Sequence, residues 1–508
     1  MARICGTIMN KQIITSRHSR RHFIKYSSLA IGATTLTGPY LLRGQNLNSR
    51  LNIAQVGCGG KGHSDLQCCL MAGQNIAALC DIHAGAVEQA NRMLGKLNQN
   101  VPNAVQLPSS KLYKDYRKLL EEDKSIDAVD VATPDHMHAI IAETAIKLGK
   151  HVYCQKPLTH DVYEARTLRE LAKKYNVATQ MGNQGSSSDG LRRAVEVIHA
   201  GLIGPVRQAY VWTNRPIWPQ GFDRPEGSDP VPEYLDWDLW LGTAPMRPFK
   251  SQWPESGGGG PRGNVYQPFV WRGWQDFGTG ALGDMACHTV NWPFRALKLG
   301  FPTEIEATAF NGSRQPIQLN KEMYPVASQI RFEFPEREGL PPVTFHWSDG
   351  GIRPAKELTA DVEAMLGEVS HSGCIMVGDK GMVYSGDDGD QELQFYVKLK
   401  DDKEMVSGMN HPAAKEIPES IPRSAFPHNY PPDVRQHMEW IAAAQSGKHD
   451  SAYSNFDIAA YLTEIILLGC VALRVGKKLE WDGPGMRATN APEAARFVKR
   501  EYRKSWAI

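Results

Sequence analysis

The stretch LNIAQVGCGGKGHSDLQCCLMAGQNIAALCDI, residues 51–82, decides the fold. An apolar run at 51–56 is followed by a glycine-rich turn, a helical pattern at 62–72 and a second apolar run at 76–80. Short apolar runs bounded by turn residues indicate buried strands. The order of strand, turn, helix and strand predicts the opening unit of a parallel, doubly wound sheet.

Three glycines in this turn have the spacing G-x-G-x-x-G, which is typical of dinucleotide-binding turns. The first permits the tight turn, the second lets backbone N–H groups approach a diphosphate, and the third lets the helix pack close to the strand. The diphosphate is then expected at the positive N-terminal end of the helix. A glycine turn without a ligand is the alternative. The predicted cofactor contacts in the turn are Gly57, Gly59, Gly60, Lys61 and Gly62.

Asp81 directly follows the second apolar run. A carboxylate at this position accepts hydrogen bonds from the ribose hydroxyls of the adenosine half of a dinucleotide, and it repels a 2′-phosphate. The sequence therefore predicts NAD as the cofactor, in preference to NADP.

The alternation of strands and helices continues to residue 184. The candidate strands are 125–134, 150–157 and 177–184, and the candidate helices are 138–149 and 162–176. In such sheets, ligands bind at the carboxyl ends of the strands. The further cofactor-binding candidates that this rule places along one rim are Thr133, Pro134, His136, His138, Gln155, Lys156 and Asn183.

Several motifs stand in an order that resembles the family of glucose–fructose oxidoreductase and inositol dehydrogenase. They are GCGGKG (57–62), ATPDHMHA (132–139), GKHVYCQKPL (149–158) and GTGALGDMACH (278–288). The resemblance is strongest over residues 51–185, and it implies an NAD-dependent oxidoreductase. Two positions depart from it: the family usually has Glu where this chain has Gln155, and Asn where it has Asp135.

After residue 185 the regular alternation of strands and helices ends. Long loops separate the candidate strands 206–214, 304–312, 327–335, 343–350 and 374–386. The resemblance implies an α+β domain with one large, mostly antiparallel open sheet. We expect three parts: a signal and linker at 1–48, an NAD-binding Rossmann domain at 49–184, and a substrate-binding and oligomerisation domain at 185–508. Most tryptophans of the loop 215–275 are expected to pack under it, although some could stack on a sugar ring.

Asp284 and His288 are four residues apart at the start of a predicted helix, so they share one helix face. An ordinary surface pair is the alternative. The resemblance implies that His288 is the acid/base group and Lys156 its electrostatic partner, while Asp284 orients the substrate or His288. Histidine suits proton transfer near neutral pH. Asn183 and Arg272, with Asp284 and His288, are the candidate substrate-binding residues.

The N-terminal segment SRRHFIK, residues 19–25, precedes a weakly apolar stretch that is interrupted at Pro39. This order resembles a twin-arginine export signal. A disordered basic N-terminus is the alternative. Because the twin-arginine route moves folded proteins, a dinucleotide could be carried out with the chain. We therefore expect a periplasmic or extracytoplasmic protein that holds its NAD tightly.

The bulk composition excludes several classes of function. Lys and Arg number 57 and Asp and Glu 55, so the net charge of +2 gives no reason to expect nucleic acid as a partner. After residue 50 the sequence contains no uninterrupted run of about 18 apolar residues, so no membrane span is predicted there. Cysteines and histidines show no zinc-like spacing, so no metal is expected. The family resemblance implies a homo-oligomer formed through the open sheet, since that sheet face would otherwise be an exposed apolar patch.

Three functions remain open for a carbohydrate partner. The first is oxidation of a hydroxyl on a sugar, glycoside or polyol ring, with the cofactor recycled in place. The second is glycoside cleavage through transient oxidation and elimination, as in α-N-acetylgalactosaminidases that depend on NAD. The third is a sugar-binding protein without catalysis. The particular sugar and ring carbon do not follow from the residues.

Overall fold

The computed structural model describes residues 50–100, 110–254, 260–386 and 392–506 of the chain. The predicted export signal lies outside the described residues.

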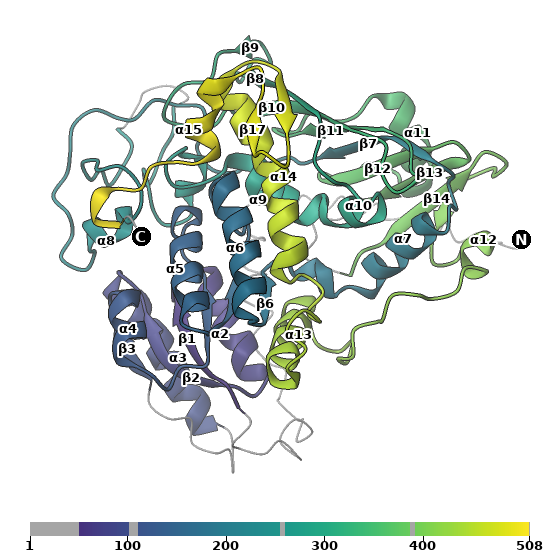
Figure 1. Ribbon diagram of the computed structural model, residues 1–508. Coiled ribbons are helices and arrows are strands. Elements are labelled where there is room, and N and C mark those ends of the chain that lie inside the picture. The colour runs from purple at the N-terminus through teal and green to yellow at the C-terminus, as the bar shows by residue number, and fades with distance from the viewer. Residues whose placement is uncertain (1–49, 101–109, 255–259, 387–391, 507–508) are drawn as a thin grey trace, which may run out of the picture. The chain divides into compact units, whose positions relative to one another are not determined.

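The first sheet is a six-stranded parallel sheet with the order β3-β2-β1-β4-β5-β6 (Figure 1). This is the strand order of a Rossmann fold, and it confirms the predicted doubly wound sheet. Its strands are β1 (Asn52–Val56), β2 (Asn75–Cys80), β3 (Lys111–Tyr113), β4 (Ala128–Val131), β5 (His151–Cys154) and β6 (Thr179–Met181). Its helices are α2 (Lys61–Met71), α3 (Ala84–Asn100), α4 (Tyr116–Glu122), α5 (Asp135–Lys147) and α6 (Val162–Tyr175).

The second sheet is larger and mostly antiparallel, as expected, with the order β15-β14-β13-β12-β7-β11-β10-β8-β16-β17 and β9 beside β8. One internal pair, β7 with β11, is parallel. Its strands are β7 (Val206–Trp212), β8 (Glu304–Phe310), β9 (Pro316–Ile317), β10 (Ala327–Phe334), β11 (Val343–Ser348), β12 (Gly373–Gly378), β13 (Gly381–Ser385), β14 (Phe395–Leu399), β15 (Val406–Ser407), β16 (Leu479–Asp482) and β17 (Arg487–Ala488).

The predicted single strand at 374–386 is wrong, because this segment is a hairpin of β12 and β13. Asp379 and Lys380 form its turn between Gly378 and Gly381, which pair across the end of the ladder. Two glycines that flank a polar pair are typical of a hairpin turn. The apolar residues on both sides of this turn made the segment look like one continuous strand.

The helices outside the Rossmann sheet range in length from four to 20 residues. They are α7 (Asp189–His199), α8 (Trp237–Leu241), α9 (Gly280–Thr289), α10 (Asn291–Ala296), α11 (Lys356–Leu366), α12 (Pro412–Lys415), α13 (Pro432–Ser446), α14 (Phe456–Val475) and α15 (Ala495–Val498), with short 3₁₀ turns that include η2 (Gln184–Ser187) and η3 (Val270–Gly273).

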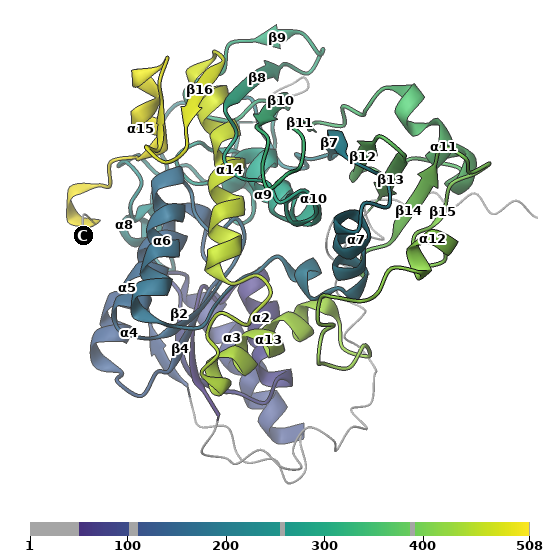
Figure 2. The ribbon, with the colours of Figure 1, turned by 45° about the vertical axis from the view of Figure 1, so that its right-hand side comes forward.

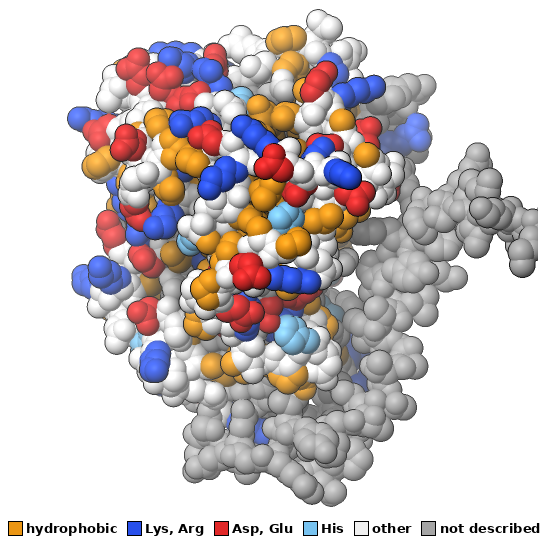
Figure 3. Space-filling model, turned by 90° about the vertical axis from the view of Figure 1, so that its right-hand side faces the viewer, with side chains coloured by type: hydrophobic (Ala, Val, Ile, Leu, Met, Phe, Trp, Pro, Cys, Tyr) orange, Lys and Arg blue, Asp and Glu red, His pale blue; other side chains and the backbone are white. Residues whose placement is uncertain are grey.

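The two faces of the second sheet differ in polarity. Along β10, Ile330, Phe332 and Phe334 are buried, whereas Gln329 and Arg331 are exposed on the opposite face. β11 alternates in the same way. The outer face of these two strands is therefore polar. It does not form the exposed apolar patch that was expected to drive oligomer formation. Figure 3 shows the face beside β14 and α12, where charged side chains of both signs are interspersed among hydrophobic ones.

The long helix α14 joins the two sheets. It packs against α6 of the first sheet and against β8 of the second (Figures 1 and 2). The Asn455 side chain caps its start by accepting a hydrogen bond from the Asp457 N–H, and Gly476 ends it in the left-handed conformation. By length and composition α14 could cross a membrane, but 78% of its most apolar 18-residue stretch is buried inside the protein. In this fold it is a core helix.

Helix α13 returns to the first sheet from the far end of the sequence. Val434 and Trp440 on α13 belong to the same buried cluster as Ile53, Leu79 and Tyr153 of the Rossmann strands. The core around the first sheet therefore includes a segment that lies beyond the expected boundary at residue 184.

The tryptophan-rich loop folds over a core of its own. Its aromatic rings are buried together, as we expected for most of them. The buried aromatic residues of this cluster are Trp237, Trp240, Phe249, Trp253, Tyr266, Trp274 and Phe277.

Candidate functional site

The glycine turn has the backbone geometry that a dinucleotide needs. Gly57 has φ +88°, and a Cβ there would lie 2.5 Å from the Ala132 carbonyl oxygen. A Cβ on Gly62 would lie 1.9 Å from the Gly57 oxygen. Only glycine meets both requirements. By contrast, nothing lies within 4 Å of the Cβ position of Gly60, and Gly59 meets only a methyl group, so this side of the turn is open to a ligand.

Asp81 lies at the carboxyl end of β2, beside the turn. Its carboxylate accepts hydrogen bonds from the N–H groups of Cys58 and His83, each at 2.8 Å. Burial raises the pKa of Asp81, and the backbone donors oppose that effect. Each carboxylate oxygen accepts one of these bonds and keeps a second lone pair for a ribose hydroxyl. The turn and Asp81 together fit the adenosine diphosphate half of NAD.

The next rim position follows β4. Pro134 precedes α5 as its N-cap, and the Thr133 hydroxyl is buried without a hydrogen-bond partner among the described residues. A buried hydroxyl without a partner is costly, so Thr133 is suited to contact a ligand.

The imidazoles of His136 and His138 are used inside the protein, which corrects the expectation that they line the cofactor site. His136 Nε2 lies 3.0 Å from the Trp240 oxygen, and His138 bridges the Pro157 and Thr133 oxygens at 2.8 Å each. Both rings are buried, and burial lowers the pKa of both. They fix the start of α5 and the segment after β5.

Lys61 and Gln155 also turn away from the expected cofactor position. Lys61 Nζ lies 2.6 Å from both Asp65 and Asp433, and Gln155 Nε2 donates to Asp65 at 2.8 Å. Carboxylates that flank an ammonium hold it by charge. The two residues thus belong to a buried polar cluster between α2 and α13, and only their backbone remains available to a ligand at the rim.

Lys156, Asp284 and Arg272 form the charged centre of the site. Lys156 follows β5, and its Nζ lies 2.9 Å from Asp284 Oδ1 on α9. Arg272 Nε donates to the same oxygen at 2.9 Å. Burial alone would raise the pKa of Asp284, but the two cations outweigh it and hold that pKa well below its usual range. The carboxylate is therefore ionised, and it fixes the lysine at the strand end.

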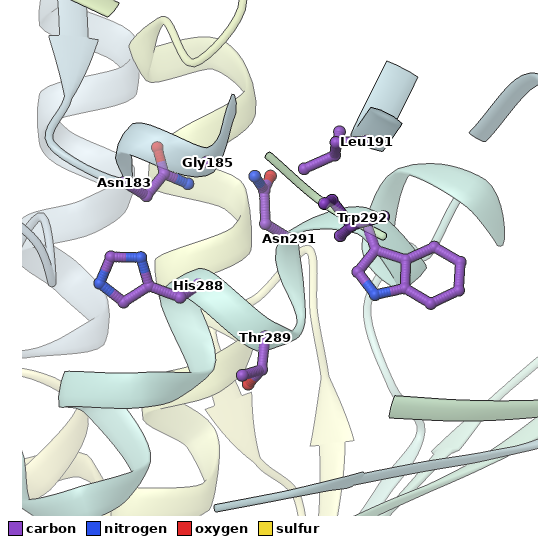
Figure 4. A pocket seen from close by; sticks show the side chains of 8 residues that line it. Asn183, Gly185, Leu191, His288, Thr289, Asn291 and Trp292 are labelled. Atoms are coloured by element: carbon purple, nitrogen blue, oxygen red, sulfur yellow. The ribbon is translucent and has the colours of Figure 1, made fainter. Parts of the chain in front are cut away.

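His288 lies one turn after Asp284 on α9 and lines a pocket with Asn183, as Figure 4 shows. Burial, with the charge of Lys156 beside it, lowers the pKa of His288 to about 3. Its Nδ1 has no hydrogen-bond partner among the described residues. The imidazole is thus neutral near pH 7 and has a free nitrogen lone pair or N–H, as an acid/base group requires. Asn291 and Trp292 line the same pocket.

Asn183 is held from several sides. Its Nδ2 donates to the Cys287 oxygen at 3.1 Å, and its Oδ1 accepts from Ser454 at 2.6 Å. Gln436 on α13 donates to its backbone oxygen at 2.9 Å. These contacts fix the side chain at the wall of the pocket.

Three residues near the site were missed as candidates from the sequence. Asp135, noted only as a family departure, is buried, accepts a hydrogen bond from Thr279 and has one oxygen without a partner among the described residues. Burial raises its pKa to about 7. Asp433 and Gln436 reach the site from α13. The Pro-Pro pair at 431–432 signals a helix start, but no local signal shows which sheet that helix covers.

Comparisons with known proteins agree with this geometry. Residues 51–183 match the model of the GFO/IDH/MocA family, described as an oxidoreductase family with an NAD-binding Rossmann fold. Levoglucosan dehydrogenase of Pseudarthrobacter phenanthrenivorans is 33% identical over 92 residues, 18% of this chain and 23% of that protein. Glycosyl hydrolase family 109 protein 1 of Shewanella sp. (strain MR-4) is 31% identical over 125 residues, 24% of this chain and 26% of that protein. The chain thus aligns with about a quarter of the length of these relatives.

A solved structure of an inositol dehydrogenase homologue from Azotobacter vinelandii, complexed with NAD⁺, has a TM-score of 0.54 at 18% identity. That match covers 85% of this chain and 97% of the other, so the fold extends through both sheets. The match over 51–183, the Rossmann strand order and the glycine turn beside Asp81 lead to one conclusion. Residues 51–183 of the chain form an NAD-binding Rossmann domain that matches that of the GFO/IDH/MocA oxidoreductase family.

Proposed function

We propose that this protein is an oxidoreductase that uses NAD to oxidise a hydroxyl on the ring of a sugar, glycoside or polyol. The observation that carries the proposal is the meeting of Lys156, Asp284 and His288 at the carboxyl edge of the Rossmann sheet. Relatives named as a levoglucosan dehydrogenase and an inositol dehydrogenase homologue support the substrate class.

The residues divide the chemistry as follows. NAD, when bound, supplies the acceptor for the hydride that leaves the ring carbon. The neutral His288 imidazole takes the proton of the substrate hydroxyl at its free nitrogen. The Lys156 ammonium stabilises the negative charge that develops on the substrate oxygen. Asp284 holds Lys156 in place, and Arg272 shares the carboxylate charge.

A second candidate is glycoside cleavage through transient oxidation of the ring. Oxidation acidifies the neighbouring C–H, which permits elimination of the aglycone before the ring is reduced again. The similarity to a glycosyl hydrolase family 109 protein favours this reading. The absence of a carboxylate at Gln155 also distinguishes this chain from the usual dehydrogenase pattern.

One experiment separates these functions. The full chain is purified without added cofactor, denatured, and assayed for released NAD and NADH. The intact protein is then mixed with inositols, levoglucosan and 4-nitrophenyl glycosides, including the N-acetyl-α-galactosaminide. Lasting formation of reduced nicotinamide supports the dehydrogenase, whereas release of nitrophenol without net reduction supports the glycosidase. A protein that neither carries nor binds NAD contradicts both.

We also propose export with the cofactor already bound. The support is the arginine pair in SRRHFIK together with a cofactor that a compartment outside the cytoplasm does not replenish. Replacing Arg20 and Arg21 with lysine should retain the protein in the cytoplasm. An unchanged distribution in cell fractions would contradict the export proposal and leave the enzymatic one intact.

A further inference from the structure

A buried cluster of polar side chains lies between α2, α13 and β4, apart from the Lys156 site. Helix α2 supplies Asp65 and Cys69, which are four residues apart and share a helix face. Strand β4 supplies Asp130, and α13 supplies His437. None of these four side chains is more than a few per cent exposed. The proposed reaction uses none of them.

The tautomer of His437 follows from its contacts. His437 Nδ1 lies 2.8 Å from the Asp433 carbonyl oxygen, which can only accept, so Nδ1 carries the hydrogen. The ring of Tyr153 stacks on the imidazole, with 4.0 Å between centroids. This is the arrangement of a metal-bound histidine, whose outer N–H donates to a carbonyl and whose other nitrogen faces the ion.

The other nitrogen faces carboxylates at distances that no hydrogen bond explains. His437 Nε2 lies 3.5 Å from Asp130 Oδ2 and 3.8 Å from Asp65 Oδ1, and it makes no hydrogen bond with the described residues. An N–H···O bond needs about 2.7–3.2 Å. A lone pair aimed at two carboxylates is repulsive unless a proton or a metal cation lies between them.

The same distances match the edges of a metal tetrahedron. Bonds of about 2.0–2.3 Å to zinc place the ligand atoms about 3.3–3.8 Å apart. The two His437 distances fall in this range, and Cys69 Sγ lies 3.8 Å from Asp130 Oδ2. The ligand atoms of Cys69, Asp130 and His437 all lie within 4.8 Å of one another.

The charge of the cluster also calls for a cation. Asp65, Asp130 and Asp433 face a single lysine ammonium, that of Lys61, among the described residues. With three ionised carboxylates and a neutral His437, the cluster would hold two surplus negative charges in a buried volume, which a divalent cation would neutralise.

We propose that Cys69, Asp130 and His437 bind a zinc ion. Gln55 and Gln155 orient the two carboxylates from outside, since their amides donate to Asp130 and Asp65. The ion ties α2, whose start carries the glycine turn, to α13 at the other end of the chain. Its role is structural, because its three ligands are fully buried and come from two helices and a strand that the ion connects.

The test uses the full chain, purified without a histidine tag and stripped with a chelator. Wild-type protein should carry about one zinc per chain before stripping. It should then bind one Co²⁺ with the visible bands of a tetrahedral site and a sulfur-to-cobalt charge-transfer band. Cys69→Ala should lose that band and weaken Co²⁺ binding at least tenfold, and Asp130→Asn, which keeps the side-chain volume, should weaken it similarly.

Cys374→Ala is the matched control, because Cys374 is equally buried but lies on β12 of the second sheet. It should bind Co²⁺ as the wild type does. The proposal is overturned if wild-type protein carries no zinc and binds no Co²⁺, in which case His437 holds a proton between the carboxylates. It is also overturned if Cys69→Ala keeps the wild-type spectrum, because the ion is then bound elsewhere.

Discussion

Replacing Asp284 with asparagine keeps the size of the side chain and removes the charge that Lys156 and Arg272 share. Both cations lie 2.9 Å from the same Asp284 oxygen. The three side chains are 11–19% exposed, so water screens them little. Removing one partner of a buried ion pair costs roughly 3–5 kcal/mol, because the remaining charge is left without compensation. Here two cations would be left facing each other.

The assay is thermal unfolding at pH 7, followed by calorimetry. With an unfolding entropy of about 2.1 cal/mol/K per residue, a chain of this size loses about 1 °C of midpoint per kcal/mol. Asp284→Asn should therefore lower the midpoint by about 3–5 °C. The control is Glu306→Gln, which breaks an exposed pair with Arg331 and should move the midpoint by at most about 1 °C.

The pH dependence of the unfolding midpoint provides a second test of the same prediction. The pKa of Asp284 lies below its unfolded value, so its contribution to stability is present above about pH 4 and is lost as the pH falls further. The midpoints of wild type and Asp284→Asn should converge below pH 4. A variant within 1 °C of wild type at pH 7, or a gap that stays constant on acidification, would refute the reasoning.

Three further substitutions test the site. Gly57→Ala places a Cβ 2.5 Å from a carbonyl oxygen, so NAD affinity by calorimetric titration should fall at least about tenfold; unchanged affinity would contradict the turn geometry. His288→Gln should keep NAD affinity but reduce kcat/KM by about 10² or more, and full activity would exclude His288 as the acid/base group. Asp135 has a raised pKa of about 7, so its contribution is complete below about pH 4 and is lost as the pH rises to 7. Asp135→Asn should therefore show a smaller loss of stability between pH 4 and 7 than the wild type. Identical pH profiles of stability for the two proteins would contradict the raised pKa of Asp135.

Local sequence patterns predicted the first sheet well. The glycine turn, the apolar runs and the alternation with helices are short-range signals, and each strand from β1 to β6 except β3 was placed within a few residues. β3 was missed because its three residues, Lys111–Tyr113, are mostly exposed and carry no apolar run. Edge strands of this kind look like loops in a sequence.

The site was harder to predict because its geometry depends on long-range contacts. The glycine spacing identified the positions of Gly57 and Gly62, and the helix period put Asp284 and His288 on one face. Whether a polar side chain points at the ligand or into the core is set by partners far along the chain. Lys61 turns inward because Asp433, 372 residues later, lies above it. A periodic pattern of apolar residues carries no information about a contact between residues so far apart in the sequence.

The return of α13 to the first sheet has a consequence for the biosynthesis of the protein. Strands β7 to β15 of the second sheet lie in the sequence between the Rossmann strands and α13, which completes the core around the first sheet. A fragment that ends at residue 184 would leave bare the apolar surfaces that α13 and α14 cover. The partner that steadies the glycine turn emerges from the ribosome only after most of the polypeptide has been made. We therefore expect NAD to bind only after the C-terminal helices have been translated.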